Sequence, residues 1–265
     1  MINFKKLLIG SAALAFTTMT LAAPTATTLK HFTKAQRAEL NTYMQSYIMN
    51  HPQVIVSAIQ KMQADAQMKQ VAAGRQAVAT NVLALVQDKY SPAINSGPVT
   101  LVEFFDYQCS VCHMMYPQVE KFMKEHPNVR IVFKEFPIFG PASTYAAKIS
   151  IAARLQGKTK FMAFHNGMFK SGLMEGKLKD TDVDRIAKTA GLDMAKLKTD
   201  MNAKAVTNEL KTTFTLAQKL KLPGTPAFVI LPTDGKNAKM MKKITFIPGG
   251  TRYEGLQQAL KKIES

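Results

Sequence analysis

Residues 99–112 read Val99-Thr100-Leu101-Val102-Glu103-Phe104-Phe105-Asp106-Tyr107-Gln108-Cys109-Ser110-Val111-Cys112. The first seven residues are rich in β-branched and aromatic side chains and predict a buried strand. Apolar residues from Met114 to Lys124 recur at helical spacing, so a helix is expected to begin near the cysteines. The stretch therefore predicts a strand-to-helix junction that carries a Cys-x-x-Cys pair.

Cys109 and Cys112 are the only two cysteines among 265 residues. A structural zinc site needs about four Cys or His ligands, and a disulfide scaffold needs several bridges. A bridge between residues three apart closes a small ring and adds little stability, because it removes little entropy from the unfolded chain. Thiol–disulfide exchange remains as the chemistry that suits this pair. The amides at a helix N-terminus favour a thiolate, so we expect Cys109 to attack and Cys112 to resolve.

Two segments resemble the DsbA-like thiol-disulfide oxidoreductases of the thioredoxin superfamily. The stretch from Glu103 to His113 resembles their active-site segment, and residues 224–230, Gly-Thr-Pro-Ala-Phe-Val-Ile, resemble their cis-proline loop. This resemblance implies that Pro226 lies beside the cysteines and that the backbone of Thr225 pairs with an extended client chain. We therefore expect a cis peptide bond before Pro226, although an ordinary trans bond is the commoner form.

The resemblance covers residues 91–265 and implies an α/β chain with a thioredoxin fold. Between its two motifs, residues 131–136 predict a second strand, and about 141–222 predict a helical insertion. The helical patterns of the insertion cover residues 143–156, 160–171, 181–190 and 193–220. Strands at 227–231 and 243–247 and a closing helix at 253–263 complete the expected fold.

Glu103 is an acidic residue inside an apolar strand. In related proteins an acidic residue six positions before the first cysteine helps to move a proton to the resolving thiol, and the resemblance implies this role for Glu103. Lys134, in the neighbouring predicted strand, could be its buried partner. The alternative places Lys134 in solvent and makes Glu103 a charge at the strand end, because an unpaired buried charge is costly.

His113 raises an alternative chemistry. Cys109-x-x-Cys112-His113 also fits the attachment motif of c-type haem, with His113 as an axial ligand. Haem attachment requires neither the preceding apolar strand nor the distant Gly-Thr-Pro segment, so exchange without a cofactor is favoured.

A calcium loop is disfavoured at Asp180, Asp182 and Asp184, because Arg185 replaces the required glycine. A helix start capped by Thr181 with Asp184 fits these residues better, and no metal is expected.

The N-terminus indicates export. Lys5 and Lys6 precede an apolar run that ends in Leu21-Ala22-Ala23, so residues 1–23 are expected to form a cleaved signal peptide and the protein to lie in the periplasm. An uncleaved membrane anchor is the alternative.

The net charge of the chain is strongly positive. Loss of residues 1–23 lowers it from +17 to +15. The lysines are scattered over predicted helices, so a solvated basic surface is favoured over nucleic-acid binding.

Residues 24–90 predict a helical extension before the catalytic domain. Amphipathic patterns cover residues 33–49 and 54–73, and a third apolar set lies between 78 and 86. These apolar faces either fold back on the catalytic domain or pair with other copies of the chain. We favour a homo-oligomer, dimer or trimer, because the ScsC-like subgroup of DsbA-like proteins carries such an association region.

The resemblance also bears on the direction of reaction. Thr225 before Pro226 is similar to the isomerase branch, and Ser110-Val111 departs from the Pro-His of the strong oxidants. We expect a disulfide isomerase or reductase with possible oxidase activity, whose clients are unfolded or wrongly disulfide-bonded exported proteins. A DsbD-like or DsbB-like membrane protein would be its redox partner. A monomer-like DsbA-type oxidase and a redox-inert chaperone are the alternatives.

Overall fold

The computed structural model describes residues 31–88, 90–235 and 241–265. The predicted signal peptide lies outside the described residues. The chain divides into two compact units, one ending at Gln60 and one beginning at Lys61. Within the described ranges, no helix is both long enough and apolar enough to cross a membrane.

The larger unit is built on a five-stranded sheet in the order β1-β3-β2-β4-β5. The central strands β2 and β3 are parallel, and the other neighbours are antiparallel. The strands predicted at 99–105, 131–136, 227–231 and 243–247 are all present, whereas the two-residue β1 is too short to leave a sequence pattern. The strand bounds are β1 Ala93–Ile94, β2 Val99–Phe105, β3 Val129–Glu135, β4 Ala227–Pro232 and β5 Thr245–Ile247.

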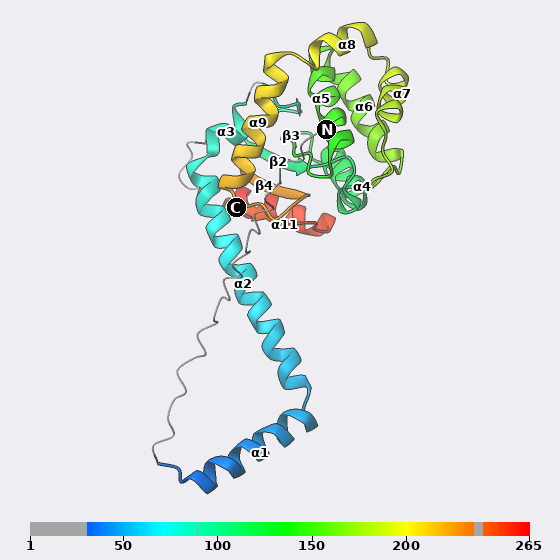
Figure 1. Ribbon diagram of the computed structural model, residues 1–265. Helices are drawn as coiled ribbons and strands as arrows, with labels where there is room; N and C mark the ends of the chain where they lie inside the picture. Colours follow the sequence, from blue (N-terminus) through cyan, green and yellow to red (C-terminus); the bar gives the residue numbers. More distant parts are fainter. Residues whose placement is uncertain (1–30, 89, 236–240) are drawn as a thin grey trace, which may run out of the picture. The chain divides into compact units, whose positions relative to one another are not determined.

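Helices cover both faces of this sheet (Figure 1). Helix α4 follows β2, α11 closes the chain, and α5 to α9 form the predicted insertion between β3 and β4. The bounds are α4 Ser110–Glu125, α5 Pro141–Leu155, α6 Lys158–Lys170, α7 Asp180–Thr189, α8 Met194–Asp200, α9 Lys204–Lys219 and α11 Tyr253–Glu264.

Two details of the insertion differ from the prediction. The helix expected over 193–220 is interrupted after Asp200, so that Leu197 and Val206 can both reach the core. Helix α7 begins at Asp180, before the predicted cap Thr181. The Asp182 carboxylate accepts a hydrogen bond from the Lys179 amide, and Asp184 instead accepts one from the Tyr145 hydroxyl at 2.7 Å.

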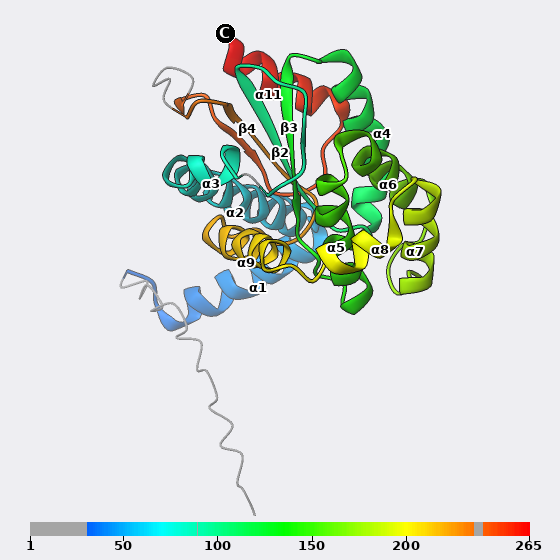
Figure 2. The same ribbon diagram turned by 90° about the horizontal axis from the view of Figure 1, so that it is seen from above.

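Successive side chains along each strand point to opposite faces of the sheet, so the core has two layers. Leu101 and Phe105 of β2 face α4, α11 and the first helices of the insertion. Val102 and Phe104 face the opposite layer, which contains residues of α9. Figure 2 shows α9 on one side of the sheet and α4 and α11 on the other. Helix α4, which begins next to Cys109, therefore packs on one defined face of the sheet.

The opposite face is completed by helices that precede β1. These are α2 (Gln53–Thr80) and α3 (Val82–Val86), and their buried residues in the same layer as Phe104 are Val78, Val82, Leu85 and Val86. Arg130 of β3 also donates a hydrogen bond to the Val86 carbonyl at 2.7 Å. The larger unit therefore begins at Lys61, before the expected boundary at residue 91, because apolar side chains of α2 and α3 cover a face of its sheet.

The smaller unit contains α1 (Lys34–Asn50) and the start of α2. Thr33 and Gln36 form a reciprocal capping box at the beginning of α1, and the helix buries none of its residues. Its large apolar side chains Tyr43, Met44 and Tyr47 are exposed, as is Ile55 in α2. Among its described residues, 31–60, this unit thus has exposed apolar side chains and no buried core.

Candidate active site

Cys109 occupies the N-cap position of α4, at the end of the connection from β2. Its amide donates a hydrogen bond to the Asp106 carbonyl at 3.1 Å. The Asp106 carboxylate, almost fully buried, accepts hydrogen bonds from the amides of Gln108 at 2.8 Å and Ile138 at 2.7 Å and from the Ser143 hydroxyl at 2.7 Å. Asp106 thus ties the cysteine loop to the segment after β3. Its position directly after a buried strand was the available signal, and the sequence prediction missed this role.

The Thr225–Pro226 peptide is cis, which confirms the prediction. The antiparallel register pairs Phe104 of β2 with Ala227 of β4, so the loop before β4 lies at the edge of the sheet where β2 ends. Cys109 Sγ lies 3.2 Å from the Thr225 carbonyl oxygen, to which the thiol donates when it is protonated. The sheet register therefore brings together two motifs that are more than a hundred residues apart in sequence.

The two sulfur atoms have very different acidities. A hydrogen bond from the Cys112 thiol, together with the amides of Val111 and Cys112, lowers the pKa of Cys109 from 9.0 to about 6, although burial opposes this shift. Burial raises the pKa of Cys112 far above its usual range, and the charges of Cys109 and Glu103 add to that effect. Cys109 is thus poised as a thiolate at neutral pH, while Cys112 stays protonated.

Glu103 lies in the buried strand β2 and is 3% exposed. Burial raises the pKa of its carboxyl group from 4.5 to about 8. The ionised Glu103 is also one of the causes that raise the pKa of Cys112. Glu103 is therefore a buried acid that is electrostatically coupled to the second cysteine.

Lys134 is not the partner of Glu103, contrary to the prediction. In the parallel register Glu103 is opposite Phe133 and Phe104 is opposite Lys134, so the two charged side chains leave the sheet on opposite faces. Nor does Lys134 reach solvent, because its side chain is fully buried. Both sequence interpretations of this lysine are wrong.

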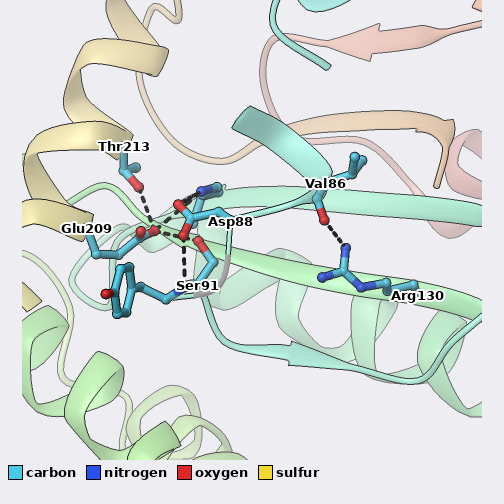
Figure 3. A network of polar contacts seen from close by, with 8 residues as sticks. Val86, Asp88, Ser91, Arg130, Glu209 and Thr213 are labelled. Atoms are coloured by element: carbon cyan, nitrogen blue, oxygen red, sulfur yellow. Dashed lines mark hydrogen bonds and ion pairs between the residues drawn. The ribbon is translucent and has the colours of Figure 1, made fainter. Parts of the chain in front are cut away.

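The actual partners of Lys134 are two carboxylates on the other face. Its Nζ lies 2.7 Å from Asp88 Oδ2 and 3.3 Å from Glu209 Oε1. Figure 3 shows Asp88 and Glu209 side by side, with the hydroxyls of Ser91 and Thr213 directed at Glu209. Burial and the neighbouring Asp88 raise the pKa of Glu209 to about 7. The hydrogen bond from Glu209 and the charge of Lys134 outweigh burial and hold the pKa of Asp88 well below its usual value.

His113 lies in the first turn of α4. Its Nε2 is 2.8 Å from the Tyr107 carbonyl oxygen, and its ring meets the Phe169 ring edge-on at 5.1 Å between centroids. Both cysteines are buried, and Cys109 contacts Thr225. This arrangement fits exchange between the two sulfur atoms and gives no support to haem attachment, in which both would be bonded outward to a porphyrin.

Comparison with known proteins agrees with this geometry. Residues 100–261 match the model of the DSBA-like thioredoxin domain. The chain belongs to this family. The crystal structure of BcfH from Salmonella enterica Typhimurium, at 33% identity and a TM-score of 0.71, covers 87% of this chain and is itself covered to 97%. The catalytic domain of Proteus mirabilis ScsC is 25% identical, with a TM-score of 0.60. The match covers 72% of this chain and 99% of that domain.

A curated relative gives a shorter match. The probable disulfide bond formation protein D of Bacillus anthracis is 24% identical over 147 residues, which is 51% of this chain and 66% of that protein. The match thus spans just under two thirds of that relative's length. The thioredoxin fold with a helical insertion and an N-terminal helical region, expected from the sequence, is confirmed, and the family is one of thiol-disulfide oxidoreductases.

Burial of Glu103 predicts a characteristic pH dependence of stability. Because its folded-state pKa of about 8 lies above the unfolded value of 4.5, ionisation favours the unfolded chain, and stability falls as the pH rises through this window. In Glu103→Gln the fall in unfolding free energy is expected to be smaller by a few kcal/mol. Urea unfolding below pH 4.5 and above pH 8 measures this difference in unfolding free energy. Glu264→Gln, at the exposed end of α11, is the control. If the unfolding free energy of Glu103→Gln depended on pH as that of the wild type does, the expectation would be contradicted.

Proposed function

We propose that this protein is a periplasmic disulfide isomerase and reductase with oxidase capacity, acting on exported proteins. The observation that carries the proposal is the asymmetric pair at the start of α4. Cys109, whose pKa is lowered to about 6, contacts the Thr225 backbone, and Cys112 is buried behind it. An exchange catalyst needs such a pair, because one sulfur must attack as a thiolate while the other is held back.

The proposed reaction begins with attack of the Cys109 thiolate on a client disulfide. The client S–S bond breaks, one client sulfur leaves as a thiolate, and a mixed disulfide forms with Cys109. A client thiolate can then attack the client sulfur of this mixed disulfide, which returns the Cys109 thiolate and changes the client's pairing without net redox change. Alternatively, Cys112 loses its proton and attacks Cys109 Sγ, which releases a reduced client and leaves the Cys109–Cys112 disulfide.

Glu103 is proposed as the group that takes the proton from Cys112. It is buried, its pKa is raised to about 8, and its charge acts on Cys112. A carboxyl group with a pKa near the working pH can accept and return a proton, as a general base requires. A DsbD-like membrane partner would return the disulfide to the dithiol, whereas a DsbB-like partner would keep the pair oxidised.

The surface beside the cysteines suits unfolded clients. Ile138 and Phe139 are partly exposed, and Ile138 lies next to Gly224 of the Thr225–Pro226 loop. Met114 is 66% exposed, whereas Met115 packs in the core. Of the two methionines, Met114 is thus the one available as an adaptable apolar contact. The Thr225 backbone is proposed to pair with an extended client segment across this surface.

The activity is tested by reactivation of a scrambled disulfide-bonded enzyme with wild type and Cys109→Ala. Recovery that disappears in the variant supports an isomerase, whereas recovery that survives indicates a redox-inert chaperone. Refolding of a fully reduced substrate with the same pair measures the oxidase activity. A monomer-like oxidase would refold the reduced substrate and leave the scrambled one inactive.

The proposed location rests on the sequence and on relatives. Residues 1–23 carry the pattern of a cleaved signal peptide. One solved structure, at 25% identity, is described as a periplasmic thioredoxin-like protein from Salmonella enterica serovar Typhimurium. Fractionation of cells that produce the full chain tests the proposal: a mature protein in the periplasmic fraction supports it, and a membrane-bound full-length protein supports the anchor alternative.

Self-association through the smaller unit is proposed as well, as a dimer or trimer. Helix α1 buries none of its own residues, and Tyr43, Met44 and Tyr47 are exposed on it. Light scattering is expected to give a multiple of the chain mass for residues 24–265 and the mass of one chain for residues 61–265. The truncation must stop at residue 60, because Val78 and the residues after it fill the core of the catalytic unit. Equal association of both forms would contradict the proposal.

A further inference from the structure

A loop of the helical insertion returns to the active site. It joins α6 to α7, and the amides of Glu175 and Gly176 donate hydrogen bonds to the carbonyl and the side-chain oxygen of Gln108, at 2.8 and 3.0 Å. Gln108 in turn donates from its Nε2 to the Ser143 hydroxyl at 2.9 Å. The loop is thus fixed to the residue directly before Cys109.

These bonds place the Glu175 carboxylate at the first residue of α4. Ser110 donates to Glu175 Oε1 from its hydroxyl at 2.8 Å and from its amide at 3.3 Å. Ser110 directly follows Cys109, whereas the next amides, those of Val111 and Cys112, help to stabilise the Cys109 thiolate. The donors at the positive end of α4 are therefore shared between the Glu175 side chain and the reactive sulfur.

This sharing affects the two redox states unequally. The reduced pair carries a thiolate on Cys109, whereas the disulfide carries no charge there. A neighbouring carboxylate repels the thiolate and withdraws one of the helix-end donors, so it destabilises the reduced state and leaves the disulfide almost unaffected. A less stable reduced state makes a weaker oxidant.

We propose that Glu175, held in place by Ser110, is a positioning residue that lowers the oxidising power of the Cys109–Cys112 pair and biases the protein toward isomerisation and reduction. The proposal rests on the proposed thiol–disulfide exchange. It also gives a role to Ser110, which is the residue that binds the carboxylate at the helix end.

The test uses equilibrium with glutathione, in which the protein disulfide and two reduced glutathione molecules give the protein dithiol and one oxidised glutathione. Glu175→Gln keeps the size of the side chain and an acceptor for Ser110 but removes the charge. Its equilibrium constant for reduction is expected to rise roughly threefold to tenfold, because the carboxylate binds Ser110, the residue next to Cys109, but is exposed to screening by solvent. A tenfold rise equals about 30 mV for this two-electron couple.

Two further readouts separate charge from structure. The ultraviolet absorbance of the thiolate is expected to show a lower pKa for Cys109 in Glu175→Gln, and the difference from wild type is expected to shrink at about 1 M salt, where the screening length falls to about 3 Å. Ser110→Ala, which releases the carboxylate without removing it, is expected to shift the equilibrium in the same direction by a smaller factor. Glu264→Gln changes the net charge equally at a distant site and is expected to behave as wild type.

The outcomes are distinguishable. If wild type and Glu175→Gln both form the Cys109–Cys112 disulfide with equal equilibrium constants and equal thiolate pKa values, the role of Glu175 is overturned while the exchange function stands. If wild type forms no such disulfide at any glutathione ratio, the exchange function itself fails. A shift in Glu175→Gln that is independent of salt and matched by Glu264→Gln would also contradict the proposal.

Discussion

Cys109→Ser is expected to reduce disulfide exchange with any client to the uncatalysed background. The serine hydroxyl is not ionised at neutral pH, whereas the Cys109 thiol has a pKa of about 6 and is largely a thiolate. No other sulfur nucleophile is available in the chain, because Cys112 is the only other cysteine, is fully buried and is held protonated. The rate of reduction of a fluorogenic disulfide substrate measures the loss.

Cys112→Ser should fail at a different step. Cys109 can still attack, so the mixed disulfide with the client forms, but no second sulfur is present to resolve it. Non-reducing electrophoresis is expected to show a client adduct that accumulates in Cys112→Ser and is absent in Cys109→Ser. Adducts in both variants, or in neither, would contradict the assigned roles of the two cysteines.

Lys134→Ala is expected to lower the unfolding free energy by about 3–5 kcal/mol. The substitution removes the cation between Asp88 and Glu209 and leaves two carboxylates close together in a buried site. Urea unfolding of the reduced protein measures this loss. Lys61→Ala is the control, because the exposed Lys61–Asp65 pair is expected to contribute at most about 1 kcal/mol.

The loss in Lys134→Ala should depend on pH. Without the lysine, burial and mutual repulsion raise the folded-state pKa values of both carboxylates, so the folded variant takes up protons as the pH falls. The destabilisation is therefore expected to be largest above the pKa of about 7 that Glu209 has in the wild type, and to shrink in mild acid. A loss below about 1 kcal/mol, or one that is the same at every pH, would contradict the stabilisation of the two carboxylates by Lys134.

The strand-to-helix junction and the proline loop could be predicted because local patterns specify them. Residues 99–105 are continuously apolar apart from Thr100 and Glu103, and the cysteines follow where the helical pattern begins. The closeness of Pro226 to Cys109 came from family resemblance, since neither spacing nor composition reveals which strands are neighbours. The physical reason for this closeness is the strand register, which pairs Phe104 with Ala227.

The partners of buried charges could not be predicted. Whether Glu103 and Lys134 share a face depends on the register between β2 and β3, which is set by the packing of the whole sheet. The actual partners of Lys134 lie 46 and 75 residues away in sequence, in the connection before β1 and in α9. Similarly, the amphipathic pattern of residues 78–86 shows an apolar face but not which surface covers it.

The most direct test of thiol–disulfide exchange is the redox chemistry of the Cys109–Cys112 pair in residues 24–265. The protein is incubated with oxidised glutathione, free thiols are blocked, and the disulfide is located by peptide mass mapping, followed by reversal with reduced glutathione. An intramolecular Cys109–Cys112 disulfide is expected to form with oxidised glutathione and to be reduced reversibly. Cysteines that remain free, or a stable glutathione adduct on Cys109 that Cys112 does not resolve, would contradict it.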